Sequence, residues 1–125
     1  MEKVSDMDIQ EMINRLKAHP DSSRIGMIAT HLGVVRGTSR DGKGVTGIKV
    51  KYDYDVIADI INDIKDMDGI IEVLVNATEG ELRVGDEILA VAVAGDIREN
   101  VFKALIEAVD RIKKESSRKE EYIKG

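Results

Sequence analysis

The sequence predicts one α+β domain in which helices cover one face of an antiparallel or mixed sheet. Its 125 residues, 42% of them apolar, suffice for a single core but not for two. Apolar residues recur at helical spacing in some segments and as short β-branched runs in others. The segments follow the order helix, strand, strand, helix, strand, strand, helix, which is typical of α+β domains.

The first predicted element is an amphipathic helix that begins after Asp6 or Asp8 and ends near Ala18. An aspartate is a favourable N-cap, and Pro20 prevents the helix from continuing. The apolar residues that share one face are Ile9, Met12, Ile13 and Leu16.

Two strands are predicted next, over residues 25–35 and 45–54. Residues 37–47, which join them, include four glycines and few apolar side chains, so we expect a mobile loop. Residues 42–47 fit the pattern G-x-G-x-x-G, but a dinucleotide site needs a helix after this pattern, whereas here a strand follows. A hairpin loop is the expected structure.

The second half of the chain predicts a helix, two strands and a last helix. Asp55 is the expected N-cap of the first of these helices, and Gly69 marks its end. Turns are expected at Gly80 and Gly85. The predicted ranges are 55–67 for the helix, 70–75 and 87–94 for the strands, and 98–114 for the last helix. The charged tail, 115–125, is expected to be frayed.

Composition excludes several classes of function. The 24 acidic and 19 basic residues leave a net charge of −5, so nothing global indicates a nucleic-acid binder. No apolar run approaches the roughly 20 residues that a membrane span requires, and we expect a soluble, cytoplasmic protein. The absence of cysteine excludes thiolate chemistry, and two histidines are too few for a histidine-rich metal site. We therefore expect neither a metal nor a bound cofactor.

Basic residues are the most informative candidates for a site. Arg36 ends a predicted strand, Arg98 opens the last helix, and Lys113, Lys114, Arg118 and Lys119 crowd its C-terminal end. Spacing alone favours a solvated face that complements the helix dipole. His31, alone in an apolar strand, is more often a packed, hydrogen-bonded residue than a ligand.

Three blocks of sequence change this interpretation: GMIATHLGVVR over residues 26–36, GELRVGDE over 80–87, and RENVFKA with DRIK over 98–104 and 110–113. In this order and spacing they resemble the large, catalytic subunit of molybdopterin synthase. The resemblance implies an α/β hammerhead-type fold, a homodimer, and a small ubiquitin-like partner whose C-terminal Gly-Gly carries a thiocarboxylate. That partner would deliver sulfur to a cyclic pyranopterin monophosphate in molybdenum cofactor biosynthesis.

The same resemblance implies roles for four residues. Arg36 and Arg98 would bind the substrate's anionic groups, since a guanidinium is permanently charged and suits phosphate and carboxylate. Lys113 matches a family active-site lysine and would act as acid, base or nucleophile, and Lys119 is the candidate second lysine. We predict that Arg36, Arg98 and Lys113 converge on one electropositive pocket, within one chain or shared across the dimer.

Two departures from the family pattern leave an alternative open. Ile97 stands where the family usually has histidine, and the tail lacks the family's tryptophan. A non-catalytic family member, acting as a dimeric binding or regulatory module, is therefore the alternative to a sulfurtransferase. An unrelated small α+β dimer is a third possibility.

Overall fold

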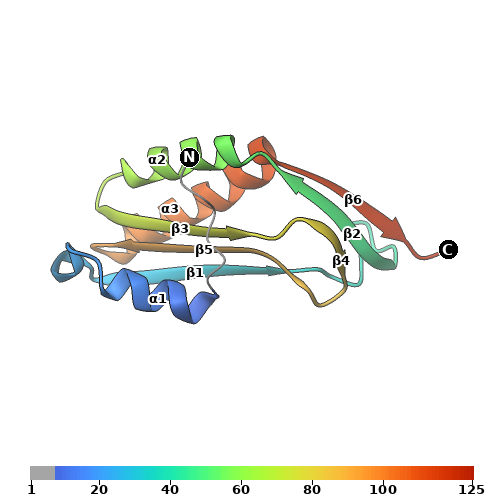
Figure 1. Ribbon diagram of the computed structural model, residues 1–125, viewed down its shortest axis with the longest axis horizontal. Helices are drawn as coiled ribbons and strands as arrows, with labels where there is room; N and C mark the ends of the chain where they lie inside the picture. The colour runs from blue at the N-terminus through green and yellow to red at the C-terminus, as the bar shows by residue number, and fades with distance from the viewer. Residues whose placement is uncertain (1–7) are drawn as a thin grey trace.

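The computed structural model describes residues 8–125 and contains two three-stranded antiparallel sheets (Figure 1). The first sheet has the order β1-β5-β3, from strands β1 (Met27–Val34), β5 (Glu87–Gly95) and β3 (Ile70–Ala77). The second has the order β4-β2-β6, from β4 (Gly80–Arg83), β2 (Val45–Tyr52) and β6 (Ser117–Ile123). The predicted α+β class with antiparallel pairing is confirmed.

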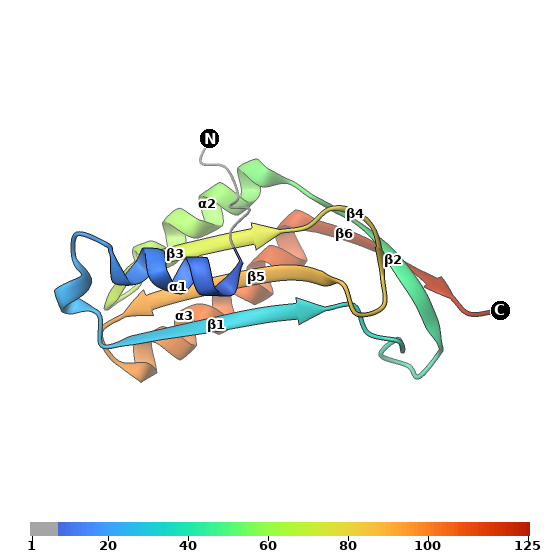
Figure 2. The same cartoon turned by 60° about the horizontal axis from the view of Figure 1, so that its bottom comes forward.

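Helices lie on both faces of the first sheet. The helices α2 (Tyr54–Lys65) and α3 (Arg98–Arg111) cover one face, and α1 (Ile9–Lys17) packs against the other (Figure 2). The expectation that helices cover one face only was therefore wrong. The central strand β5 is almost entirely apolar because both of its faces are covered. Its alanines, Ala90, Ala92 and Ala94, leave room for Met12 and Leu16 of α1.

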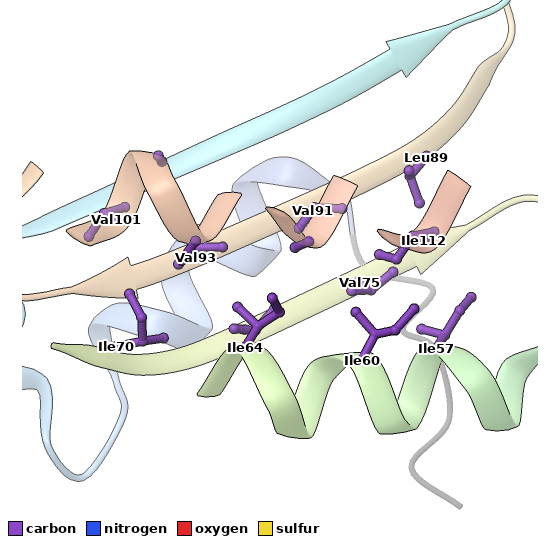
Figure 3. Close-up of a cluster of buried hydrophobic side chains, with 14 residues drawn as sticks. Ile57, Ile60, Ile64, Ile70, Val75, Leu89, Val91, Val93, Val101 and Ile112 are labelled. Carbon is purple, nitrogen blue, oxygen red and sulfur yellow. The ribbon is translucent and has the colours of Figure 1, made fainter. Parts of the chain in front are cut away.

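The larger core fills the space between the first sheet and the pair α2 and α3 (Figure 3). Ile57, Ile60 and Ile64 recur at helical spacing on α2 and are at most 1% exposed. They pack in one cluster with Val91 and Val93 of β5. Burying each such side chain contributes about 1.5–3 kcal/mol to stability. This core fixes α3 against the sheet and so fixes the chain that follows α3.

Two helix starts test the predicted caps. Asp8 caps α1, its Oδ1 accepting a hydrogen bond from the Glu11 amide at 2.8 Å, as predicted. Asp6, the other candidate, lies outside the described residues. The cap of α2 is Asp53 rather than Asp55: Asp53 Oδ1 accepts from the amides of Asp55 and Val56. The error is one of choosing between two aspartates two residues apart.

The chain after α3 differs most from prediction. The helix ends at Arg111, and a π-helical turn, Ile112–Ser116, leads into β6. Strand β6 pairs antiparallel with β2, Lys119 lying opposite Val50 and Arg118 opposite Lys51. The frayed-tail prediction was therefore wrong. Its many charges fit the solvated edge strand of a sheet, a position where charge also discourages pairing with other chains.

The connections between strands also differ in part. Gly80 and Gly85 adopt positive φ, as turn residues do, but the segment between them forms β4, which was not predicted. Strands β1 and β2 belong to different sheets, so residues 37–44 connect two sheets and are not a hairpin loop between paired strands. An isolated bridge between Thr38 and Gly44 closes this connection. No helix in the described part of the chain is long and apolar enough to cross a membrane.

Candidate active site

A cavity of about 730 Å³ opens where the two sheets meet. Its walls come from the end of β1 and the start of β5 in one sheet, from β2 and β6 in the other, and from the π turn and the 37–44 connection. Ile48, Val50, Ile88 and Leu89 supply an apolar wall. A concave apolar cavity with a few polar groups is the usual form of a small-molecule site.

Three of the four predicted residues line this cavity: Arg36, Lys113 and Lys119. Arg36 follows β1, and its Nε donates a hydrogen bond to the Thr38 carbonyl at 3.1 Å. Lys113 projects from the π turn, and Lys119 from β6. Arg40, on the 37–44 connection, is a fourth cation in the lining.

Two carboxylates in the lining are each paired with a lysine. Asp41 lies 3.9 Å from Lys43 Nζ, and Glu121 lies 4.0 Å from Lys119 Nζ. Among the described residues, Arg36, Arg40 and Lys113 form no ion pair. Three cations without carboxylate partners around one concave site give it a positive potential, and such a site attracts anions.

The cavity also contains a phenol that stays protonated. Burial, together with the nearby Tyr54 and Glu79, raises the pKa of Tyr52 to about 12. The Tyr52 hydroxyl donates to the Ile88 carbonyl at 3.4 Å, a long hydrogen bond. Tyr52 is therefore a neutral polar group in the cavity lining across the physiological pH range.

His31 lies beside the cavity wall, two residues before Gly33 on the same face of β1. A Cβ on Gly33 would lie 3.2 Å from His31 Nε2. The buried Nε2 has no hydrogen-bond partner among the described residues. The prediction that His31 is a packed, hydrogen-bonded residue is therefore wrong for this nitrogen. Burial, and then the Lys113 ammonium, lower the pKa of His31 below 6.5. The imidazole is neutral at pH 7.

This lowered pKa predicts an acid-sensitive contribution to stability. In the unfolded chain His31 binds a proton below about pH 6.5. In the folded protein it binds a proton only at a lower pH, because its pKa is lowered. The contribution of His31 to the free energy of unfolding is therefore complete above about pH 6.5, and it decreases as the pH falls below that value. The difference in unfolding free energy, wild type minus His31→Phe, should decrease between pH 7.5 and pH 5 in urea titrations. A difference that is independent of pH would contradict the prediction.

Arg98 does not join the other three within one chain. It is the first residue of α3, while Lys113 follows the end of that helix. A rise of 1.5 Å per residue separates the two by roughly 20 Å. Figure 1 shows the start of α3 at the end of the molecule away from β2 and β6. The prediction of convergence within a single chain was therefore wrong for Arg98.

Sequence reasoning also missed two lining residues, Arg40 and Tyr52. Arg40 lay in a segment interpreted only as a mobile loop, and Tyr52 in the predicted strand 45–54, to which no site was assigned. Arg40 lies only four residues after Arg36, so the sequence did show a second arginine close to a predicted site residue. Nothing in the sequence indicated that the connection folds back toward the cavity.

Comparison with known proteins identifies the family. The family model described as MoaE protein matches residues 3–115. The chain belongs to the MoaE protein family. The predicted resemblance to the large subunit of molybdopterin synthase is thus confirmed, and the possibility of an unrelated α+β dimer is excluded.

Individual relatives agree with this assignment. A probable molybdopterin synthase of Haloferax volcanii is 27% identical over 113 residues, which cover 86% of this chain but only 43% of that protein. This MoaE chain therefore spans less than half the length of that curated relative.

Solved structures share the fold. The structure of molybdopterin synthase from Staphylococcus aureus aligns with a TM-score of 0.77 at 19% identity, covering 97% of this chain and 89% of that one. A Helicobacter pylori complex of subunits 1 and 2 of molybdopterin-converting factor gives 0.68 at 15% identity, covering 94% and 80%.

Proposed function

We propose that this MoaE protein is a catalytically active large subunit of molybdopterin synthase. It transfers sulfur from the thiocarboxylated C-terminus of a small ubiquitin-like subunit to cyclic pyranopterin monophosphate, in molybdenum cofactor biosynthesis in the cytoplasm. The observation that carries this proposal is the cavity with three cations, Arg36, Arg40 and Lys113, that have no carboxylate partner among the described residues. A phosphate on the substrate and a thiocarboxylate on the partner together supply matching negative charge.

The reaction assigns a different role to each cation. The thiocarboxylate sulfur displaces an oxygen substituent from a substrate carbon, and that oxygen leaves with a proton. Water then cleaves the thioester bond between the sulfur and the acyl carbon, which leaves a thiol on the substrate and a carboxylate on the small subunit. Arg36 binds the substrate phosphate. Lys113 transfers a proton or accepts the acyl group during this sequence. Lys119, whose ammonium lies 4.0 Å from a Glu121 carboxylate oxygen, is the second lysine of the site.

Arg98 enters the proposal through a homodimer. It lies outside the cavity of its own chain, so it contributes to substrate binding only where a second subunit brings its α3 N-terminus to the cavity rim. Large apolar side chains that remain exposed on α3, Phe102 at 50% and Ile106 at 62%, are consistent with a further protein contact near this helix.

The homodimer is a prediction in its own right. At micromolar concentration the protein should have a mass of twice 13.8 kDa by light scattering coupled to size-exclusion chromatography. Edge strands and exposed apolar side chains are the surfaces that dimers commonly cover. A monomer mass over the whole concentration range would contradict the prediction and would leave Arg98 without a role at the cavity.

The decisive experiment is reconstitution. The protein is mixed with a thiocarboxylated small subunit and cyclic pyranopterin monophosphate, and dithiolene formation is measured. We expect multiple turnovers when fresh thiocarboxylated subunit is supplied. If a stable complex with the small subunit forms but no dithiolene appears, the protein is the non-catalytic module, the alternative that the missing family histidine and tryptophan had left open. The three unpaired cations favour the enzyme.

A further inference from the structure

Arg40 has an unusual position for an exposed arginine on a connecting segment. It lines the cavity, and within residues 8–125 it makes no ion pair and no side-chain hydrogen bond. The nearest acidic candidate in the same turn, Asp41, is already engaged by Lys43 and by the Ser39 hydroxyl. The five donors of the Arg40 guanidinium are therefore available to a ligand.

The turn that carries Arg40 is ordered by a buried serine. Ser39 is only 7% exposed, and its amide donates to the Lys43 carbonyl at 2.8 Å. Its hydroxyl oxygen accepts from the Lys43 amide at 3.0 Å and its hydroxyl donates to the Asp41 carboxylate. The Gly42 amide closes the turn on the Ser39 carbonyl at 3.1 Å, with Gly42 at a φ of +86°, which glycine adopts readily.

Arg36 is tied to the same segment. Its Nε donates to the Thr38 carbonyl, one residue before Ser39, which leaves the two terminal nitrogens of Arg36 without a protein partner among the described residues. Thr38 also pairs with Gly44 across the base of the segment. Two arginines thus belong to one hydrogen-bonded segment and line one cavity. A phosphate has enough oxygen atoms to accept from both at once.

We propose that Arg40 is a second phosphate-binding arginine of this cavity, presented by the turn around Ser39 so that it and Arg36 bind the same phosphate group. The inference rests on the proposed function, which makes the ligand a phosphate ester. Because the turn is hydrogen-bonded before the ligand arrives, little of the binding energy is lost in ordering it. The segment 37–44 then acts as a preformed phosphate-binding element rather than as a mobile loop.

The test uses inorganic phosphate as the probe and isothermal titration calorimetry on the intact protein at fixed ionic strength. Arg40→Ala should weaken phosphate binding about tenfold, the loss expected for a charge-assisted hydrogen bond. Arg118→Ala is the matched control: it removes the same group from β6, which lines the cavity, but Arg118 itself is not in the lining. The phosphate affinity of Arg118→Ala should stay within about twofold of wild type, because salt screens the interaction between an exposed charge and a distant ligand.

Further variants separate the inference from the proposed function. Ser39→Ala leaves the charge unchanged and should weaken phosphate binding severalfold by loosening the turn. If Arg36→Ala weakens binding but Arg40→Ala does no more than Arg118→Ala, the inference about Arg40 is wrong while the proposed function stands. If the wild-type protein binds no phosphate at all, both are wrong. Arg40 is exposed, so its replacement is not expected to prevent folding.

Discussion

Replacing Lys113 by alanine should lower the rate of sulfur transfer by about a hundredfold or more, the usual contribution of a positioned acid or base. Lys113 lies in the cavity lining on a π turn, a structure that is rare and often found at functional sites. Its ammonium has no carboxylate partner among the described residues, so it remains available to a reacting group. The loss should appear in kcat under reconstituted conditions, with a smaller effect on KM.

The adjacent lysine provides the control for this variant. Lys114 is exposed, belongs to the same turn and does not line the cavity. Lys114→Ala therefore changes the net charge equally and should leave kcat within about twofold. If both variants lose activity equally, the turn itself has been disturbed and Lys113 has no specific role. If neither does, Lys119 is the lysine that takes part in the reaction.

Much of the fold follows from local patterns in the sequence. Ile57, Ile60 and Ile64 repeat at helical spacing. Ile48 and Val50 alternate with lysines, as in a strand with one solvent-exposed face. These regularities depend on neighbouring residues alone. They therefore predicted the three helices and four of the strands, with boundaries within a few residues.

The features that were missed depend on contacts between distant residues. The tail at Ser117–Ile123 is too charged to look like a strand, and it is one because β2 offers it hydrogen bonds. The same pairing brings Lys119 to the cavity, and the π turn before it directs Lys113 there. Arg98 shows the opposite case: a motif suggested it as a site residue, but it begins α3 and so lies at the end of the molecule away from the cavity. Sequence motifs indicate which residues matter, whereas the path of the chain decides which of them meet.

Arg36→Ala should weaken the binding of a phosphate ligand by about tenfold to a hundredfold, since charge-assisted hydrogen bonds to a bidentate guanidinium are worth roughly 1.5–3 kcal/mol. Arg36 lines the cavity, and one of its nitrogens is already fixed by Thr38. Calorimetric titration with inorganic phosphate measures the effect, and Arg118→Ala again controls for the lost charge. Equal affinity in Arg36→Ala and wild type would remove Arg36 from the site.

Mixing two variants with weakened phosphate binding, Arg36→Ala and Arg98→Ala, then tests the role proposed for Arg98. If Arg98 serves the cavity of the partner subunit, Arg98→Ala should weaken phosphate binding about as much as Arg36→Ala does. A mixed dimer of the two variants then contains one cavity that lacks both arginines and one that lacks neither. It should recover about half of the wild-type sites, because each subunit supplies what the other is missing. If Arg98 instead acts within its own chain, each cavity of the mixed dimer lacks one arginine and no recovery occurs. Titration of the dimers before and after subunit exchange distinguishes these results, and an unaltered affinity in Arg98→Ala would show that this arginine belongs to the solvated surface.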